Sequence, residues 1–272
     1  MQEIKNGIDR THLKFDKFAE RGFFGGACNK EVVSGVLGIK QRKMKNEYRI
    51  SGMRKFVLTL AALPAVLLAG CKQESNYNNI TLDKYALEMR TGDTQIVYVE
   101  TGDPDNVAWR SDNEFVATVE RGRISGLRIG QTRITANNAS VSVTVRGRSD
   151  LYDEPMEDLS WNMTREQVVN RLGLPDKMEN NVLTYDLVSS VNSFKSYEFD
   201  SNNRLVAANI TVGKDKTAQL DDFLNERYLL LNGSEQGDKN YINNLTYSTS
   251  TMTVCRTGYD DDYWLVSYRQ IK

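Results

Sequence analysis

Histidine, cysteine and long apolar runs are all scarce in this 272-residue chain. The single histidine, His12, lies in a segment that we expect to be missing from the mature protein, for the reason given below. A mature chain without imidazole has no Ser–His or Cys–His hydrolase site, no histidine-ligated zinc and no ordinary histidine proton shuttle. These absences favour a binding protein over an enzyme, and we expect no metal and no cofactor.

Three cysteines leave little room for disulfides. We expect Cys28 to be lost with the segment that contains His12, and Cys71 to be modified, so that Cys255 has no intramolecular disulfide partner. Cys255 lies in the strand-like stretch "STMTVCRT", where a catalytic thiolate would lack a base. We therefore interpret it as a small residue of a strand.

The one long apolar run, Phe56–Ala69, has 14 residues and is interrupted by one threonine and one proline. Crossing a bilayer takes roughly 20 apolar residues, so this run is too short to span. It also lacks the regularly spaced polar positions of a buried amphipathic helix. Arg54 and Lys55 precede it and small residues follow it, which is the pattern of a secretory signal. We predict a signal peptide over residues 53–70.

The four residues "LAGC", ending at Cys71, resemble the lipobox of bacterial lipoproteins. The resemblance implies that Cys71 is lipidated and becomes the mature N-terminus, followed by a polar tether over residues 71–79. Two or three acyl chains would hold the protein stably on a membrane without a protein span. We expect a lipid-anchored protein of the cell envelope, on the outer membrane, with periplasmic and cell-surface exposure left open.

A signal peptide must emerge first, yet residues 1–52 precede this one. We interpret this polar, basic segment as a misassigned upstream start, with translation beginning at Met44 or Met53. The alternative is a cytoplasmic tail on a signal anchor.

The charge of the chain changes once the leader is removed. Residues 1–70 hold 13 of the 35 Lys and Arg residues and 6 of the 36 Asp and Glu residues, so the mature chain carries a net charge of −8. Because no basic cluster remains, nucleic acid is not an expected partner.

Residues 80–146 read as short alternating segments separated by Gly, Asp and Asn, which predicts a small antiparallel β-sandwich. Ile134 and Ala136, for example, should face one side while Arg133 and Thr135 face the other. The stretch "WRSDNEFVATVERGRISGLRIGQTRITA" resembles the bacterial immunoglobulin-like group 2 domain. The positions that fall on its pattern are Trp109, Ser111, Asn113, Val116, Ala117, Val119, Gly122, Ile124, Gly130, Thr132, Ile134 and Ala136. The resemblance implies an all-β sandwich that spaces or holds another module, with Trp109 in the core.

After an acidic linker over residues 147–158, the pattern of residues 159–272 changes to helix followed by strands. "NMTREQVVNRLGLPD" predicts a helix that begins after Thr164 and ends before Gly173. Three strand candidates follow, and "TAQLDDFLNERYLL" then begins a second helix with three more. We predict an α+β domain built as a degenerate tandem repeat, with two helices on one face of an antiparallel sheet.

The opening of this domain, "WNMTREQVVNRLGLPD", resembles the tandem family that includes the beta-lactamase inhibitor protein and the small lipoprotein of the outer-membrane barrel-assembly machine. The resemblance implies protein binding by the exposed face of the sheet. The best surface candidate for binding is a run of acidic and aromatic residues at a predicted hairpin, namely Tyr259, Asp260, Asp261, Asp262, Tyr263 and Trp264. It could be a calcium turn or a patch for sugar or protein, but an acidic structural turn is the simpler interpretation.

We therefore expect a non-enzymatic envelope lipoprotein in which an immunoglobulin-like spacer presents a C-terminal domain that binds a protein or glycan. The alternatives are a component of envelope assembly and, with less support, a carboxylate-dependent enzyme acting on glycans.

Overall fold

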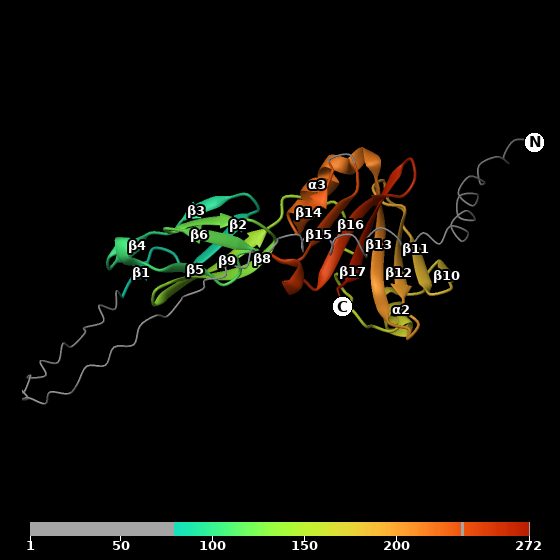
Figure 1. The fold of residues 1–272 in the computed structure, drawn as a ribbon, viewed down its shortest axis with the longest axis horizontal. Helices are drawn as coiled ribbons and strands as arrows, with labels where there is room; N and C mark the ends of the chain where they lie inside the picture. The colour runs from blue at the N-terminus through green and yellow to red at the C-terminus, as the bar shows by residue number, and fades with distance from the viewer. Residues whose placement is uncertain (1–78, 235–236, 272) are drawn as a thin grey trace, which may run out of the picture. The chain divides into compact units, whose positions relative to one another are not determined.

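The computed structural model describes residues 79–234 and 237–271, which belong to one compact unit, Asn76–Lys272 (Figure 1). These residues form seventeen β-strands and two α-helices, so the fold is mostly β. The expected signal peptide, the alternative start sites and Cys71 lie outside the described residues. Among the residues described, none of the helices combines the length and apolar character needed to cross a membrane.

Residues 79–146, here called the sandwich region, form three small sheets with the strand orders β2-β9-β8-β5, β3-β7-β6 and β1-β4. The strands are β1 (Thr81–Leu82), β2 (Ala86–Arg90), β3 (Thr94–Ile96), β4 (Val99–Thr101), β5 (Trp109–Ser111), β6 (Ala117–Glu120), β7 (Arg123–Gly126), β8 (Gly130–Ala136) and β9 (Ala139–Arg146). The predicted strand "TQIVYVE" becomes β3 and β4, because the chain changes partner within it from β7 to β1.

Alternation along the strands builds one hydrophobic core in this region. Ile134 and Ala136 are fully buried while Arg133 is exposed, as predicted. Trp109 packs against the same core, and a Cβ on Gly122 would lie 3.3 Å from its ring. This placement agrees with Trp109 as a packing residue.

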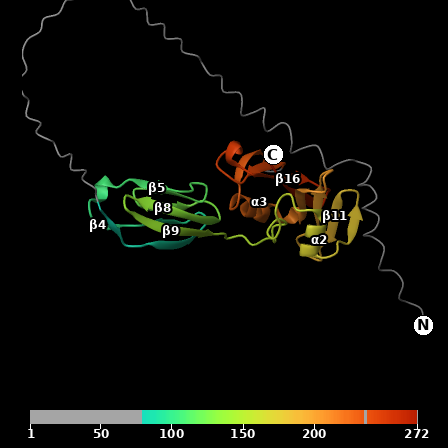
Figure 2. The same cartoon turned by 90° about the horizontal axis from the view of Figure 1, so that it is seen from below.

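The first long strand and the last strand of the sandwich region pair in parallel. Ala86 of β2 lies opposite Ser142 of β9, and Arg90 lies opposite Arg146. The chain therefore enters near the start of β2 and leaves at the end of β9, at opposite ends of the region (Figures 1 and 2). The eight residues of β9 separate these ends by about 25 Å, at roughly 3.3 Å for each residue.

Residues 150–271, here called the helix-and-sheet region, contain one eight-stranded antiparallel sheet in the order β10-β11-β12-β13-β17-β16-β15-β14. Its elements are α2 (Arg165–Leu172), β10 (Lys177–Glu179), β11 (Val182–Asp186), β12 (Phe194–Phe199), β13 (Leu205–Gly213), α3 (Thr217–Asn225), β14 (Leu229–Gly233), β15 (Lys239–Ile242), β16 (Met252–Gly258) and β17 (Tyr263–Gln270). Each helix precedes four strands, and the two halves meet where β13 pairs with β17.

The predicted repeat of helix and three strands is thus wrong in its strand count, because β10 and β14 were missed. The strand predicted over "INNLTYS" is also wrong, since it overlaps β15 only at Ile242. The sequence predicted a second helix running through "RYLL", but α3 ends at Asn225 and β14 begins at Leu229. A short apolar run has no periodicity of its own that separates a last helical turn from a strand. Leu229 and Leu230 form a strand because they pair with β15.

Helix α2 begins and ends where the sequence predicted. The Thr164 side chain accepts from the Gln167 N–H and the Gln167 side chain accepts from the Thr164 N–H, which forms a complete capping box. Gly173 follows with φ of 90°, a conformation that costs glycine little.

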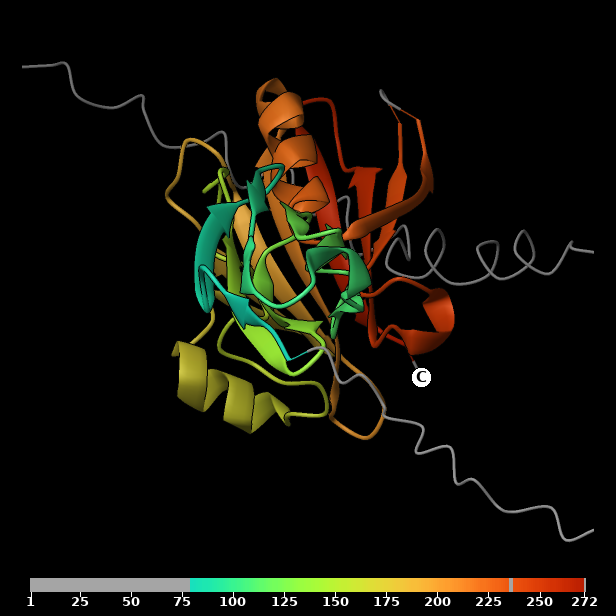
Figure 3. The same ribbon diagram turned by 90° about the vertical axis from the view of Figure 1, so that its left-hand side faces the viewer.

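Both helices pack on the same face of the sheet, as Figure 3 shows. Val168 of α2 and Phe223 of α3 belong to one buried cluster with the strand residues of that face. The buried strand residues are Leu183, Tyr197, Phe199, Leu205, Ala208, Ile210, Val212, Tyr241, Val254, Trp264, Val266 and Tyr268. This cluster shares no residue with the core of the sandwich region, but the predicted division into separate domains stays a prediction.

Candidate functional site: the Glu226 junction, the acidic turn and the outer sheet face

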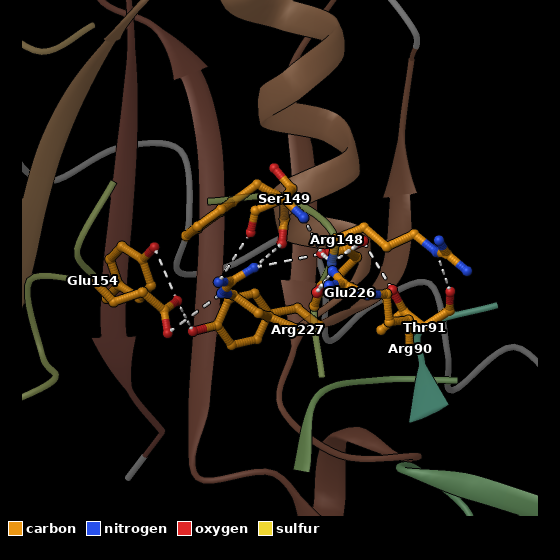
Figure 4. Close-up of polar contacts among 11 residues, drawn as sticks. Arg90, Thr91, Arg148, Ser149, Glu154, Glu226 and Arg227 are labelled. Atoms are coloured by element: carbon orange, nitrogen blue, oxygen red, sulfur yellow. Dashed lines mark hydrogen bonds and ion pairs between the residues drawn. The ribbon is translucent and has the colours of Figure 1, made fainter. Parts of the chain in front are cut away.

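The sandwich region and the helix-and-sheet region are joined by a carboxylate at the end of α3. Glu226 follows the last residue of α3, and its side chain is 12% exposed. Its carboxylate accepts hydrogen bonds from the Thr91 hydroxyl at 2.8 Å and from the Arg148 and Ser149 N–H groups at 2.9 Å (Figure 4). Three donors from two separate segments therefore converge on one carboxylate, and we call this contact the Glu226 junction.

Backbone and apolar contacts extend the junction. The Glu226 carbonyl oxygen accepts a hydrogen bond from the Ile129 N–H at 2.8 Å, and Leu229 packs against the sandwich core. A Cβ on Gly147 would lie 2.7 Å from the Ile129 side chain and 2.9 Å from the Glu226 carboxylate. Only glycine fits at position 147 without displacing one of these groups.

An open hollow of about 580 Å³ lies beside the junction, lined by Thr91, Gly92, Leu127, Arg148, Ser149, Gln219, Asp222, Asn225 and Glu226. The Arg148 guanidinium pairs with Asp93, and the Glu226 carboxylate is occupied by its three donors. These charged groups hold the junction together and do not form a general acid and base pair.

A second carboxylate, Glu154, lies at the other side of Arg227 (Figure 4). It accepts hydrogen bonds from the hydroxyls of Tyr228 and Tyr268, the second at 3.4 Å, and lies 3.9 Å from the Arg227 guanidinium. Burial raises the pKa of the Glu154 carboxyl, and this effect outweighs the Tyr228 hydrogen bond and the Arg227 charge, which lower it. This cluster fixes the linker against the sheet.

The raised pKa of Glu154 gives a testable pH dependence. Because the folded chain binds this proton more readily than the unfolded chain, the stabilising contribution is largest below the ordinary value of 4.5 and is lost as pH rises through the raised pKa. Glu154→Gln keeps an acceptor oxygen but does not titrate. We expect wild type to lose stability relative to E154Q as pH rises from below 4.5 through the raised pKa, measured by urea denaturation. A difference that does not change with pH would contradict this assignment.

The acidic turn predicted as a binding patch is closed by its own first aspartate. The Asp260 carboxylate accepts from the N–H groups of Asp262 and Tyr263, both at 2.8 Å. Lys214 donates its backbone N–H to the Asp262 carbonyl at 2.8 Å and its side-chain amine to the Asp260 carbonyl. This geometry is ordinary turn chemistry. Within the described ranges, no three His, Cys, Asp or Glu residues lie close enough together to hold a metal ion.

The aromatic residues of that patch belong to different surroundings. Trp264 is buried in the core beneath α3, where its indole N–H donates to the Thr217 hydroxyl at 2.8 Å. Tyr259 instead contacts the ring of Phe194, with centroids 5.4 Å apart, outside the core cluster. Asp261 and Asp262 are exposed. The six predicted residues are therefore neighbours along the chain, but Trp264 contributes to packing and not to the surface.

The face of the sheet opposite the helices carries a polar row. Its residues stand opposite one another on seven neighbouring strands, in the order Thr184, Ser196, Asn209, Ser267, Cys255, Asn240 and Asn232. Ser267 donates to the Asn209 amide oxygen at 2.6 Å, and the Asn209 amide donates to Ser196 at 3.2 Å. Ser196, Asn209, Ser267 and Cys255 of the row are buried, so its centre is held by hydrogen bonds among its own members.

Cys255 stands in this row, 2% exposed, with its sulfur 3.0 Å from the Asn240 amide oxygen. The expectation of a small buried strand residue is confirmed. The expectation that it has no disulfide partner is wrong, because Cys255 is disulfide-bonded.

Sequence patterns did not reveal the Glu226 junction. Its donors lie 77 to 135 residues from Glu226 in the chain. Neither the sequence around Glu226, "LNERY", nor that around Arg148, "RGRSD", matches a known interaction motif. Gly147 was the one local signal, since a glycine directly after a strand marks a close approach. Comparisons of the chain with protein-family models, with curated proteins and with solved structures found no match.

Proposed function

We propose that this protein is a non-enzymatic, lipid-anchored component of a bacterial envelope, in which the sandwich region spaces a binding module from the membrane. The observation that carries the proposal is the parallel pairing of β2 with β9, which separates the entry and exit of the chain. A domain that the chain enters at one end and leaves at the other adds length between a membrane anchor and the domain that follows.

The Glu226 junction supports the same role. A spacer presents its cargo in a defined way only when the connection between them is fixed. Three hydrogen bonds to one carboxylate, the Ile129 contact and the packing of Leu229 supply such a connection. In this proposal residues 80–146 are a bacterial immunoglobulin-like group 2 domain and residues 147–158 are the linker.

The binding role is assigned to residues 159–272, in the manner of the tandem family that includes the beta-lactamase inhibitor protein. Both helices pack on one face, and the polar row occupies the other. We assign protein binding to that outer face, while glycan binding, envelope assembly and glycan cleavage are the outcomes against which it is tested.

Anchoring is tested by Cys71→Ala in the full chain expressed in a bacterium. We expect wild type to sediment with the membranes and C71A to be soluble, because the acyl chains supply the attachment. Intact mass of the wild type should correspond to a chain that begins at a lipidated Cys71. Cys28→Ser is the matched control and should leave fractionation unchanged. Membrane attachment of C71A would contradict the proposal.

Binding is tested with photo-crosslinking residues at Leu265 and Thr257 on the outer face, and at Glu166 on α2 as the control. We expect protein adducts from the outer-face positions only. One stoichiometric envelope partner would favour assembly, and a foreign protein would favour recognition. If the purified protein cleaved a glycan and lost that activity with one carboxylate removed, the non-enzymatic assignment would fail.

A further inference from the structure

Two tyrosines protrude at the end of the sandwich region where the described chain begins. Tyr85 is 57% exposed and Tyr98 is 61% exposed, and they are the most exposed aromatic side chains among the described residues. Asp83 joins the two segments: its N–H donates to the Tyr98 carbonyl at 3.0 Å, and its carboxylate accepts from the Tyr98 N–H at 2.8 Å. The two tyrosines therefore lie on neighbouring segments of the sandwich region.

The fold does not require aromatic rings at these positions. Neither tyrosine belongs to the sandwich core, whereas their neighbours Leu82 and Val97 are buried in it. The Tyr85 hydroxyl lies 3.4 Å from the Leu82 N–H, a long contact that fixes the ring weakly. Large amphipathic rings left in water here indicate a surface selected for contact with something outside the chain.

The charges at this end argue against an anionic or nucleic-acid partner. Lys84, the residue before Tyr85, lies 3.7 Å from the Asp83 carboxylate, which offsets its charge. Glu100, Asp103 and Asp105 are exposed nearby in sequence. The partner that best fits the two tyrosines is a neutral surface that accepts both an aromatic ring and a hydroxyl. The interface of a zwitterionic bilayer has that chemistry.

The length of the tether limits how far the sandwich region can lie from a lipid on Cys71. Cys71 is eight residue steps before Asn79, the first described residue, a span of at most about 28 Å. A flexible chain of that length has a root-mean-square extension of about 15 Å. Lipid on Cys71 therefore keeps the entry end, and with it Tyr85 and Tyr98, close to the bilayer.

We infer that Tyr85 and Tyr98 form a second, interfacial contact with the bilayer that holds the Cys71 lipid, and that this contact orients the sandwich region on the membrane. The inference rests on the proposed function, because without the anchor no bilayer is held beside these residues. Tyrosine is suited to this position since its ring enters the headgroup layer while its hydroxyl stays hydrated.

The test places a fluorescent reporter at each position in the full chain. Lipid-bearing Tyr85→Trp and Tyr98→Trp proteins are purified from cells and reconstituted into phosphatidylcholine vesicles with or without bromine on the upper acyl chain. The signal is the fluorescence of each variant minus that of the parent. We expect bromine to reduce this signal about twofold at positions 85 and 98, because both rings lie at the interface. Tyr247→Trp, 37% exposed in the helix-and-sheet region, is the control and should be unaffected.

Flotation separates the two ways of failing. If the proteins float with the vesicles and bromine leaves the signals at positions 85 and 98 unchanged, the interfacial contact is overturned while the anchor stands. If the lipid-bearing preparation does not float at all, the anchor fails and the contact fails with it. Equal quenching at position 247 would also overturn the inference, because the contact would not be specific to the entry end.

Discussion

Glu226→Ala is expected to lower the free energy of unfolding by about 2–3 kcal/mol, because it leaves the Thr91 hydroxyl and two backbone N–H groups without their acceptor. The loss of these three hydrogen bonds to a carboxylate would lower the free energy of unfolding further in a site that excludes water. The open hollow beside the junction lets water reach the freed donors, which limits the loss. Urea denaturation in reducing buffer measures the change, on a soluble form that lacks the lipid anchor.

Amide hydrogen exchange gives a more local measurement of the same variant. The Arg148 and Ser149 N–H groups should exchange much faster in E226A, because their protection comes from the Glu226 carboxylate. Glu226→Gln keeps one acceptor oxygen and should lie between wild type and E226A. Glu120→Ala, at an exposed position on β6, is the matched control and should change neither quantity. Unaltered exchange at Arg148 and Ser149 in E226A would show that the carboxylate does not hold the junction.

Arg256→Ala is expected to be more damaging, with a loss of about 3–5 kcal/mol, because it removes a buried cation from its ion pair. The Arg256 side chain is fully buried on β16 and bonds to the Asp221 carboxylate and the Gly237 carbonyl. Its guanidinium also lies 4.4 Å from the centre of the Trp264 ring. Removal leaves Asp221 with Lys239 alone, at 2.8 Å, and opens a cavity beside Trp264.

Arg256→Met separates packing from charge. Methionine fills much of the space against Trp264 without the cation, so we expect R256M to lose about half as much stability as R256A. Combining R256M with Asp221→Asn should cost less than the sum of the two single changes, since both changes remove the same Arg256–Asp221 ion pair. Arg123→Ala, at an exposed position on β7, is the control. A loss below about 1 kcal/mol in R256A would contradict the importance of this pair.

Much of the secondary structure was predictable because its causes are local. The capping box of α2 depends on Thr164 and Gln167, three residues apart, and its end depends on Gly173. The alternation of Ile134 and Ala136 with Arg133 depends on the pleat of one strand. Prediction failed at β10 and β14, where pairing with a neighbouring strand gives a short segment its structure.

The candidate site was far less predictable than the fold. The run from Tyr259 to Trp264 looked like one patch because its residues are adjacent in sequence. In a strand, however, successive side chains point to opposite faces, so Trp264 of β17 enters the core while Tyr263 before it does not, and Tyr259 lies in the turn after β16. The acidic residues followed the simpler expectation, since Asp260 closes the turn with its own carboxylate.

Local sequence patterns account for the periodic features of this protein: alternating strands, two amphipathic helices, and the apolar run before Cys71 from which the anchor is proposed. These features follow from the spacing of apolar residues and from caps that act within a few positions. Three features emerge only in the folded chain: Glu226 contacts Thr91 across 135 residues, Arg256 is buried against Asp221, and seven strands align their polar residues in one row. Such contacts depend on strand register and on the close approach of distant backbone segments, which no local pattern encodes.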